Sequence, residues 1–189
     1  MGQPSPWQGY LQDVYKRQDE RAAAAATHHL LLGHGLALEA LRAELGATAE
    51  VGITLNMTAV RPVNAESKAV AQEIEAETNR IFLDPVLKGA YPTGAVRAGL
   101  LPGPEVVQDG DLARISAPID FLGINYYRPT TVGYRDLGDE RRGEERIKGH
   151  PGAVSIIADG VAHSSMGWPI DASGLHELLV LLHLSLIHI

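Results

Sequence analysis

Two short apolar segments that alternate with longer helical segments constrain this fold more than any other feature of the sequence. Residues 51–57 read Val-Gly-Ile-Thr-Leu-Asn-Met, residues 118–127 read Pro-Ile-Asp-Phe-Leu-Gly-Ile-Asn-Tyr-Tyr, and both patterns predict strands. Helices are predicted over residues 21–45, 66–88 and 171–182. Because these helices have twelve or more residues, their alternation with strands predicts parallel βα units.

This alternation fits two architectures of the α/β class, a doubly wound sheet and a (β/α)8 barrel. Neither predicted strand is followed by a Gly-x-Gly-x-x-Gly motif, and the sequence contains no Gly-x-x-x-x-Gly-Lys motif. Nucleotide-binding folds therefore lose their main support.

The helix over residues 21–45 contains two glycines near its centre. Gly33 and Gly35 weaken the helix by about 1 kcal/mol each relative to alanine. Their presence predicts that another segment packs closely against this turn. Gly46 is the predicted C-cap.

Proline and asparagine predict the next boundaries. Pro62 is expected to end the first strand, because proline cannot donate to a sheet ladder. Asn64 is the predicted N-cap of the helix over residues 66–88, and Pro85 is expected to kink or restart its last turn.

The remaining segments are predicted as loops and extended chain. Residues 89–110 are rich in glycine and proline and are expected to form a loop. Residues 130–134 are expected to prolong the second strand, and the charged residues 136–149 to form a solvated loop. Asp171 or Ser173 is the predicted cap of the last helix.

Composition narrows the class of protein. The 189 residues include 16 basic and 23 acidic side chains, so the formal net charge is −7, which argues against a nucleic-acid partner. Hydrophobic residues make up 45% and charged residues 21%, as in globular proteins. No apolar run reaches the roughly 18–20 residues that span a bilayer, and residues 1–6 show no secretory signal. We therefore expect a soluble cytoplasmic protein with no membrane partner.

The sequence offers little support for a metal or other cofactor. It contains no cysteine, which excludes disulfides and thiolate ligands. His28, His29 and His34 share one helix but point to different sides of it, whereas His176 and His183 lie two turns apart. Neither set can close on one ion with bonds of about 2 Å. We expect no metal site.

Asn125 and Tyr127 are the first candidate binding residues. Residues two apart on a strand point to the same side, and these two lie at the C-terminal end of their strand, where parallel barrels build active sites. An amide and a phenol suit a hydroxyl-rich substrate or the orientation of a carboxylate. Alternatively, they are polar groups that bond to loop backbone. Asn56 is a similar polar residue at the end of the first strand.

Trp168 is the remaining candidate. It stands in the small-residue stretch Ser-Met-Gly-Trp-Pro over residues 165–169. An indole in such a loop can stack on a ligand such as a sugar ring, or it can pack the loop against the protein.

Four stretches together resemble one family. Residues 27–37 read Thr-His-His-Leu-Leu-Leu-Gly-His-Gly-Leu-Ala, and residues 89–92 read Gly-Ala-Tyr-Pro. Residues 120–127 read Asp-Phe-Leu-Gly-Ile-Asn-Tyr-Tyr, and residues 166–171 read Met-Gly-Trp-Pro-Ile-Asp. In this order they resemble the glycoside hydrolase family 1 β-glucosidases, from the fourth helix of the barrel to the sixth.

The resemblance implies an α/β fold that is a partial (β/α)8 TIM barrel, incomplete and unclosed. Residues 21–183 would form the barrel part, whereas residues 1–20, expected to be disordered, and residues 184–189 depart from the family. The family hydrolyses terminal β-glucosidic bonds with retention, using two glutamates in Asn-Glu-Pro and Glu-Asn-Gly motifs. Neither motif occurs here, so no catalytic residue is assigned to this chain, which alone is expected to be inactive.

The resemblance also implies roles for the four candidate residues. Tyr127 would hydrogen-bond the nucleophilic carboxylate, Asn125 would lie beside it in the pocket for the glycone, and Asn56 would line that pocket further out. Trp168 would be the platform for the leaving group of a β-glucoside or oligosaccharide. Two alternatives stay open: a non-catalytic sugar-binding or scaffold module, and a different (β/α)8 enzyme with similar motifs.

Overall fold

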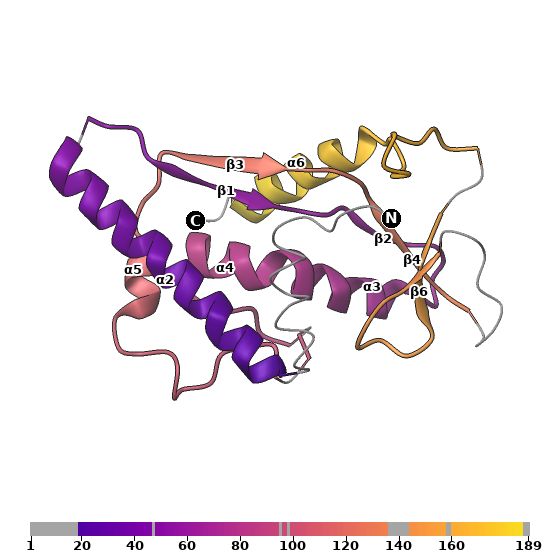
Figure 1. The fold of residues 1–189 in the computed structure, drawn as a ribbon, viewed down its shortest axis with the longest axis horizontal. Coiled ribbons are helices and arrows are strands. Elements are labelled where there is room, and N and C mark those ends of the chain that lie inside the picture. Colours follow the sequence, from indigo (N-terminus) through magenta and orange to yellow (C-terminus); the bar gives the residue numbers. More distant parts are fainter. Residues whose placement is uncertain are drawn as a thin grey trace.

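The computed structural model describes residues 19–46, 48–94, 96–97, 99–135, 144–157 and 160–186. Short strands follow helices along this chain, and Figure 1 shows the strands running beside the helices. The elements are α2 (Glu20–Leu45), β1 (Gly52–Asn56), β2 (Val60–Pro62), α3 (Lys68–Glu75), the π-helix η1 (Ala76–Arg80), α4 (Ile81–Lys88), α5 (Asp111–Ile115), β3 (Phe121–Asn125), β4 (Thr130–Tyr134), β5 (Glu145–Arg146), β6 (Ala153–Ile156) and α6 (Ser173–Leu186).

Helix α2 begins and ends where its sequence predicts. The Oδ1 atom of Asp19 accepts a hydrogen bond of 3.0 Å from the N–H of Ala22, which satisfies a donor of the first turn. At the other end Gly46 has a φ of 80°, and its N–H donates to the carbonyl of Arg42 at 3.0 Å. The predicted helix and its glycine C-cap are confirmed.

Strands β1 and β3 are parallel, as predicted. Gly52 pairs with Phe121 at one end of the ladder and Asn56 pairs with Asn125 at the other. Each strand then continues into a second parallel pair, β2 with β4, in which Val60 is opposite Thr130. Pro62 ends the extended segment, as predicted, but it does so as the last residue of the separate strand β2, because β1 already ends at Asn56.

The second sheet also contains strands that the sequence analysis did not predict. Its order is β2-β4-β6-β5, with β6 antiparallel to both β4 and β5. Strand β5 lies within residues 136–149, which were predicted as a solvated loop, so that prediction is wrong for Glu145 and Arg146. Both of these residues are exposed in a two-residue strand at the edge of the sheet, and residues 136–143 lie outside the described part.

The predicted helix over residues 66–88 is divided into three segments. It begins at Lys68, and Asn64 instead accepts a hydrogen bond of 3.0 Å from the N–H of Ser67 in the preceding turn. The interruption falls at η1, and α4 then runs through Pro85 without a break. Pro85 has no N–H for the carbonyl of Ile81, but the last turn does not restart at the proline as predicted; the change of helical pattern lies earlier, at Ala76–Arg80.

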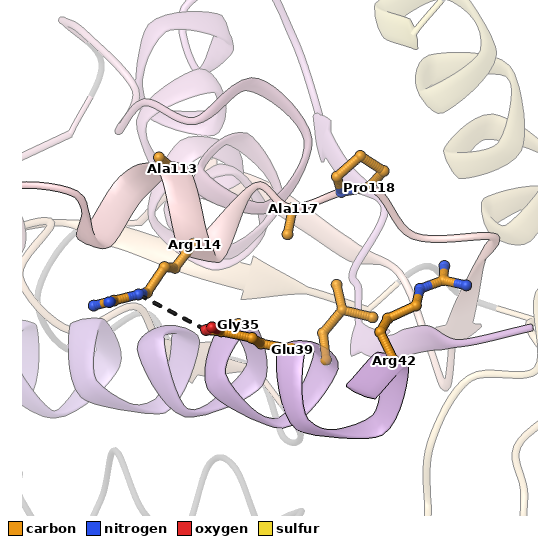
Figure 2. A pocket seen from close by; sticks show the side chains of 8 residues that line it. Gly35, Glu39, Arg42, Ala113, Arg114, Ala117 and Pro118 are labelled. Atoms are coloured by element: carbon orange, nitrogen blue, oxygen red, sulfur yellow. Dashed lines mark ion pairs between the residues drawn. The ribbon is translucent and has the colours of Figure 1, made fainter. Parts of the chain in front are cut away.

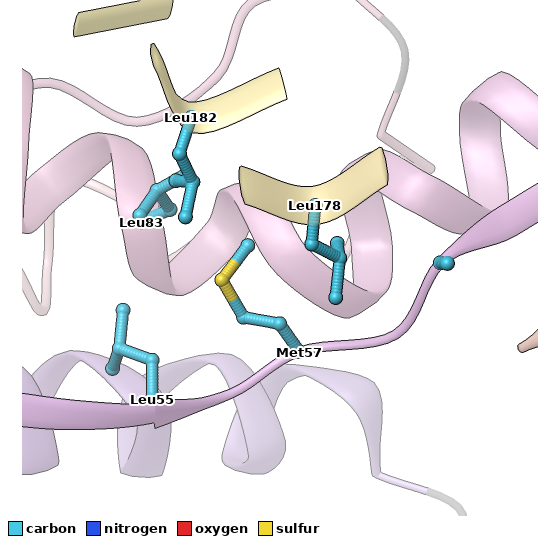
Figure 3. Packing of buried hydrophobic residues seen from close by; sticks show 6 residues of the cluster. Leu55, Met57, Leu83, Leu178 and Leu182 are labelled. Atoms are coloured by element: carbon cyan, nitrogen blue, oxygen red, sulfur yellow. The ribbon is translucent and has the colours of Figure 1, made fainter. Parts of the chain in front are cut away.

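Three clusters of buried side chains hold these elements together. One joins β1, α4 and α6 and is shown in Figure 3; its buried members are Leu55, Met57, Ala59, Leu83, Leu178 and Leu182. A second joins α3 to β4 and β6, and a third joins α2, α4 and α5. Leu122 and Ile124 of β3 pack against the first cluster, so the helices cover one face of the β1–β3 pair.

The β1–β3 pair is open on both sides within the described part of the chain. Each of these strands pairs only with the other in the first sheet. A barrel closes only when its full set of strands surrounds the axis, so this arrangement is an unclosed α/β unit. The predicted loop over residues 89–110 is confirmed in its described part, and the last helix starts at Ser173 and extends to Leu186.

Candidate active site

Asn56 and Asn125 lie side by side at the C-terminal ends of β1 and β3. They are partners in the parallel register, and the N–H of Met57 donates to the carbonyl of Asn125 at 2.9 Å. Leu55 and Ile124, their neighbours in sequence, belong to the helix-covered face. Because side chains alternate along a strand, both amides point to the opposite face. The structure therefore brings these two predicted residues together.

The chain just after Asn56 is held by a buried amide that the sequence analysis missed. Asn79 of η1 is 2% exposed; its Oδ1 accepts from the N–H of Thr58 at 3.0 Å, and its Nδ2 donates to the carbonyl of Thr58 at 2.9 Å. Glu75 accepts from the same Nδ2 at 3.4 Å, and its burial raises the pKa of its carboxyl. The sequence feature that could have indicated this contact is a single asparagine on the predicted buried side of the helix.

Tyr127 and Trp168 meet beyond the end of β3. Their ring centroids are 5.8 Å apart, with an angle of 70° between the planes, which is an edge-to-face contact. The guanidinium carbon of Arg128 lies 5.8 Å from the centroid of the Trp168 ring. Tyr127 is 52% exposed and Trp168 is half-buried, so both rings present surface to a ligand.

Trp168 stands on a loop that closes on itself. The N–H of Ser164 donates to the carbonyl of Trp168 at 2.8 Å, and the N–H of Gly167 donates to the carbonyl of Ser164 at 2.9 Å. The N–H of Ile170 donates to the carbonyl of Ala162 at 2.8 Å across the base of the loop. Three main-chain hydrogen bonds within residues 162–170 therefore hold together the loop that carries the Trp168 indole.

His28 is buried and fully engaged in structural contacts. Its side chain has no exposed surface; Nδ1 lies 3.0 Å from the hydroxyl of Tyr91, and Nε2 lies 3.0 Å from Oδ2 of Asp111. Oδ2 of Asp111 also accepts a hydrogen bond from the N–H of Gln108. The imidazole and this N–H together hold the pKa of Asp111 below its usual value. Burial raises the pKa of Tyr91. This cluster ties α2 to α5 and to the loop after α4.

A groove of about 590 Å³ lies between α2 and the segment around α5 (Figure 2). Glu39 and Arg114 form an ion pair of 3.9 Å across it, while small and apolar side chains form much of its wall. The lining residues are Gly35, Leu38, Glu39, Arg42, Ala113, Arg114, Ala117 and Pro118. Pro118 precedes β3, so the groove lies near the start of the strands and contains none of the predicted site residues.

The residues that the structure describes contain no group of three or more His, Asp or Glu side chains placed to hold a metal ion. None of the helices they form combines the length and the apolar character that crossing a bilayer requires.

Comparison with known proteins shows what kind of chain this is. The sequence profile of Glycosyl hydrolase family 1 matches residues 3–186. The chain belongs to Glycosyl hydrolase family 1. A bifunctional β-D-glucosidase/β-D-fucosidase of Bifidobacterium breve is 39% identical over 165 residues, which are 85% of this chain and 35% of that protein. β-Glucosidase A of Acetivibrio thermocellus is 34% identical over 172 residues, or 87% of this chain and 35% of the relative.

Solved family 1 structures match the fold. The psychrophilic β-glucosidase BglU from Micrococcus antarcticus superimposes with a TM-score of 0.68 at 37% identity, covering 87% of this chain and 37% of that one. The virulence factor SghA from Agrobacterium tumefaciens gives a TM-score of 0.70 at 30% identity, with 87% and 35% covered. The chain thus spans about a third of the length of these relatives. Membership in the family and a partial, unclosed (β/α)8 barrel are both confirmed.

The family assignment leaves two sets of predictions as they were. The boundaries at residues 20 and 183 stay predictions, since residues 1–18 and 187–189 lie outside the described part. The roles of Asn56, Asn125, Tyr127 and Trp168 also stay predictions, although the structure places Asn56 opposite Asn125 in the strand register and brings the two rings into contact.

Proposed function

We propose that this chain forms part of the active-site wall of a retaining β-glucosidase. The whole enzyme would hydrolyse terminal β-glucosidic bonds of β-glucosides or oligosaccharides, and both catalytic carboxylates would come from outside these 189 residues. The observation that carries the proposal is the pairing of Asn56 with Asn125 at the C-terminal ends of parallel strands in a family 1 chain. In parallel α/β barrels this end of the strands carries the active site.

The two amides suit the sugar-binding part of such a site. Each side-chain amide offers a carbonyl acceptor and two N–H donors, which match the hydroxyl groups of a pyranose. Their place on the face away from the helices leaves them free of the apolar clusters. Asn125 is exposed and Asn56 is half-buried, so in this proposal Asn125 contacts the glycone directly and Asn56 lies further out.

The two rings suit the reaction centre and the leaving group. The phenol of Tyr127 would donate a hydrogen bond to the nucleophilic carboxylate, which favours the ionised form of that group and fixes its direction of attack. A retaining mechanism needs this control because the two carboxyls stand only about 5–5.5 Å apart. The Trp168 indole, braced by Tyr127, would stack on the leaving group.

The proposal includes no cofactor or metal, because the two carboxylates carry the acid, base and nucleophile functions by themselves. It also includes the absence of nucleic-acid and membrane partners and a location in the cytoplasm, which is supported by the acidic and cysteine-free composition. Cell fractionation with an antibody to the chain tests the location.

The decisive experiment uses the full-length protein expressed from the surrounding genomic reading frame. We expect it to release nitrophenol from p-nitrophenyl β-glucoside but not from the α-anomer, and proton NMR to show the β-anomer of glucose as the first product. The purified 189-residue chain is expected to release none. Specific binding of glucose by that chain, measured by calorimetry, together with an inactive full-length protein, would favour a sugar-binding module instead.

A matched pair of variants tests the role of Tyr127 in the full-length protein. Tyr127→Phe is expected to lower kcat by about 100-fold, the cost typical of removing one hydrogen-bond donor from a reacting centre. Tyr134→Phe is the control, because Tyr134 is also an exposed tyrosine but lies on β4. Equal kcat values for the two variants would contradict the role of Tyr127.

A further inference from the structure

Asp171 joins the three segments on which the predicted site residues stand. Its Oδ2 accepts a hydrogen bond of 2.6 Å from Nη1 of Arg61, on β2, which follows the strand that ends in Asn56. Its main-chain carbonyl accepts a bond of 2.8 Å from the hydroxyl of Tyr126, the residue between Asn125 and Tyr127. Asp171 itself closely follows Trp168 in the sequence.

The carboxylate of Asp171 is held on both oxygens. Oδ1 accepts from the N–H of Ser173 at 2.8 Å and from its hydroxyl at 2.5 Å, which fixes Asp171 to the first turn of α6. Arg61 also donates to Ser173 Oγ and to Glu177, each at 2.8 Å. The Arg61 and Asp171 side chains are 26% and 23% exposed. Mainly because of Arg61, the pKa of Asp171 falls to about 2.

Tyr126 reaches Asp171 because Gly174, which lies against the Tyr126 hydroxyl, has no side chain. A Cβ atom at Gly174 would overlap the Tyr126 hydroxyl, so the phenol occupies the space that any other residue would fill. The Tyr126 ring packs at the edge of the cluster formed by β1, α4 and α6. The contact therefore fixes the C-terminal end of β3 against α6.

The position of Asp171 sets the position of Trp168. The loop that carries the indole is closed by the bond from Ile170 N–H to the Ala162 carbonyl, and Asp171 is the first residue after it. Asp171 is therefore a fixed point at the C-terminal end of the loop that carries the indole.

We propose that Asp171 is a positioning residue, which through Arg61 and Tyr126 fixes the Trp168 platform relative to the Asn125–Tyr127 strand end. The inference rests on the proposed function only where it assigns a ligand to that platform. Asp171 makes no contact with the reacting atoms; it acts through Trp168.

A double-mutant cycle in the full-length enzyme tests this action. Asp171→Asn preserves size but removes the charge that Arg61 binds. We expect it to raise KM for p-nitrophenyl β-glucoside about fivefold, as for a lost ring contact, with kcat nearly unchanged. In a Trp168→Ala background the same change is expected to add nothing, because the two residues act as one unit. Additive effects in the cycle would contradict the proposal.

The control is an ion pair of equal length elsewhere. Arg42 and Asp120 also meet at 2.6 Å, but at the start of β3. Asp120→Asn is therefore expected to remove a comparable ion pair without changing KM. If Asp120→Asn raises KM as much as Asp171→Asn does, the effect is one of general stability and the proposal fails.

A second measurement needs no enzyme activity. In the 189-residue chain with Trp7→Phe, Trp168 is the sole tryptophan, and acrylamide quenching of its fluorescence reports how firmly it is held. We expect stronger quenching in Asp171→Asn, an intermediate value in Arg61→Lys and no change in Asp120→Asn. Equal quenching in Asp171→Asn and Asp120→Asn would overturn the proposal. Altered quenching in Asp171→Asn alone, combined with an inactive full-length protein, would overturn only the glucosidase assignment.

Discussion

Two glycines of α2 that stand two residues apart are predicted to respond in opposite ways to the same substitution. A Cβ atom at Gly35 would lie 2.5 Å from the Arg114 carbonyl oxygen, 2.7 Å from its carbon and 3.0 Å from the N atom of Ile115. These are main-chain atoms of α5 and its end, so they cannot rotate away. At Gly33, by contrast, a Cβ atom would meet nothing within 4 Å.

The magnitudes follow from these surroundings. Gly33→Ala is expected to raise the free energy of unfolding by roughly 0.5–1 kcal/mol, the gain in helix propensity. Gly35→Ala gains the same propensity, but forcing α5 away from α2 costs about 1–3 kcal/mol. It also strains the packing of Ile115 against Leu31, both of which are buried. We therefore expect a net loss of stability for Gly35→Ala.

Urea unfolding of the 189-residue chain, followed by far-ultraviolet circular dichroism, measures both changes against the wild type. The midpoint should rise for Gly33→Ala and fall for Gly35→Ala, with similar slopes, because the surface exposed on unfolding is nearly the same. If both variants raise the midpoint by equal amounts, the close approach of α5 to Gly35 is wrong.

Three further predictions concern stability. His28→Ala should lower the free energy of unfolding by about 2–4 kcal/mol, because it removes a buried ring with two hydrogen bonds. In the same urea assay, substitution of the exposed neighbour, His29→Ala, should leave the free energy of unfolding nearly unchanged. The pKa of Asp171 is about 2 in the folded chain, against an ordinary value of 3.8. The ionised carboxylate therefore stabilises the fold above pH 3.8, and this stabilisation is lost as the pH falls toward 2. Thermal unfolding across this range should depend less on pH in Asp171→Asn than in the wild type. Leu178→Ala should cost about 2–5 kcal/mol and the exposed Leu179→Ala much less, so equal losses would place α6 in another orientation.

The alternation of strands and helices predicted the frame of this fold because it depends on local patterns. The parallel pairing of β1 with β3 follows from the helices between them, and the shared face of Asn56 and Asn125 follows from the period of a strand. The close packing predicted at the centre of α2 is confirmed for Gly35 but not for Gly33, since propensity alone cannot tell which glycine faces a neighbour.

The residues that hold the candidate site together were not predictable in the same way. Arg61 and Asp171 are 110 positions apart, and neither stands in a local pattern that points to the other. The role of Asn79 could not be predicted, because this residue lies in a π-helix and the spacing of hydrophobic residues does not indicate where a π-helix forms. Strands β5 and β6 are too short to show alternation, and they form only because β4 offers an edge for β6.

The hydrogen bonds from Asn79 to the main chain after β1 have a consequence for amino-acid substitutions at the C-terminal end of this strand. Both hydrogen bonds between the Asn79 amide and Thr58 are to main-chain atoms, the N–H and the carbonyl of Thr58. Exchanging Thr58 for a charged, aromatic or aliphatic residue would therefore change the chemistry offered at this exit while the path of the polypeptide stays the same.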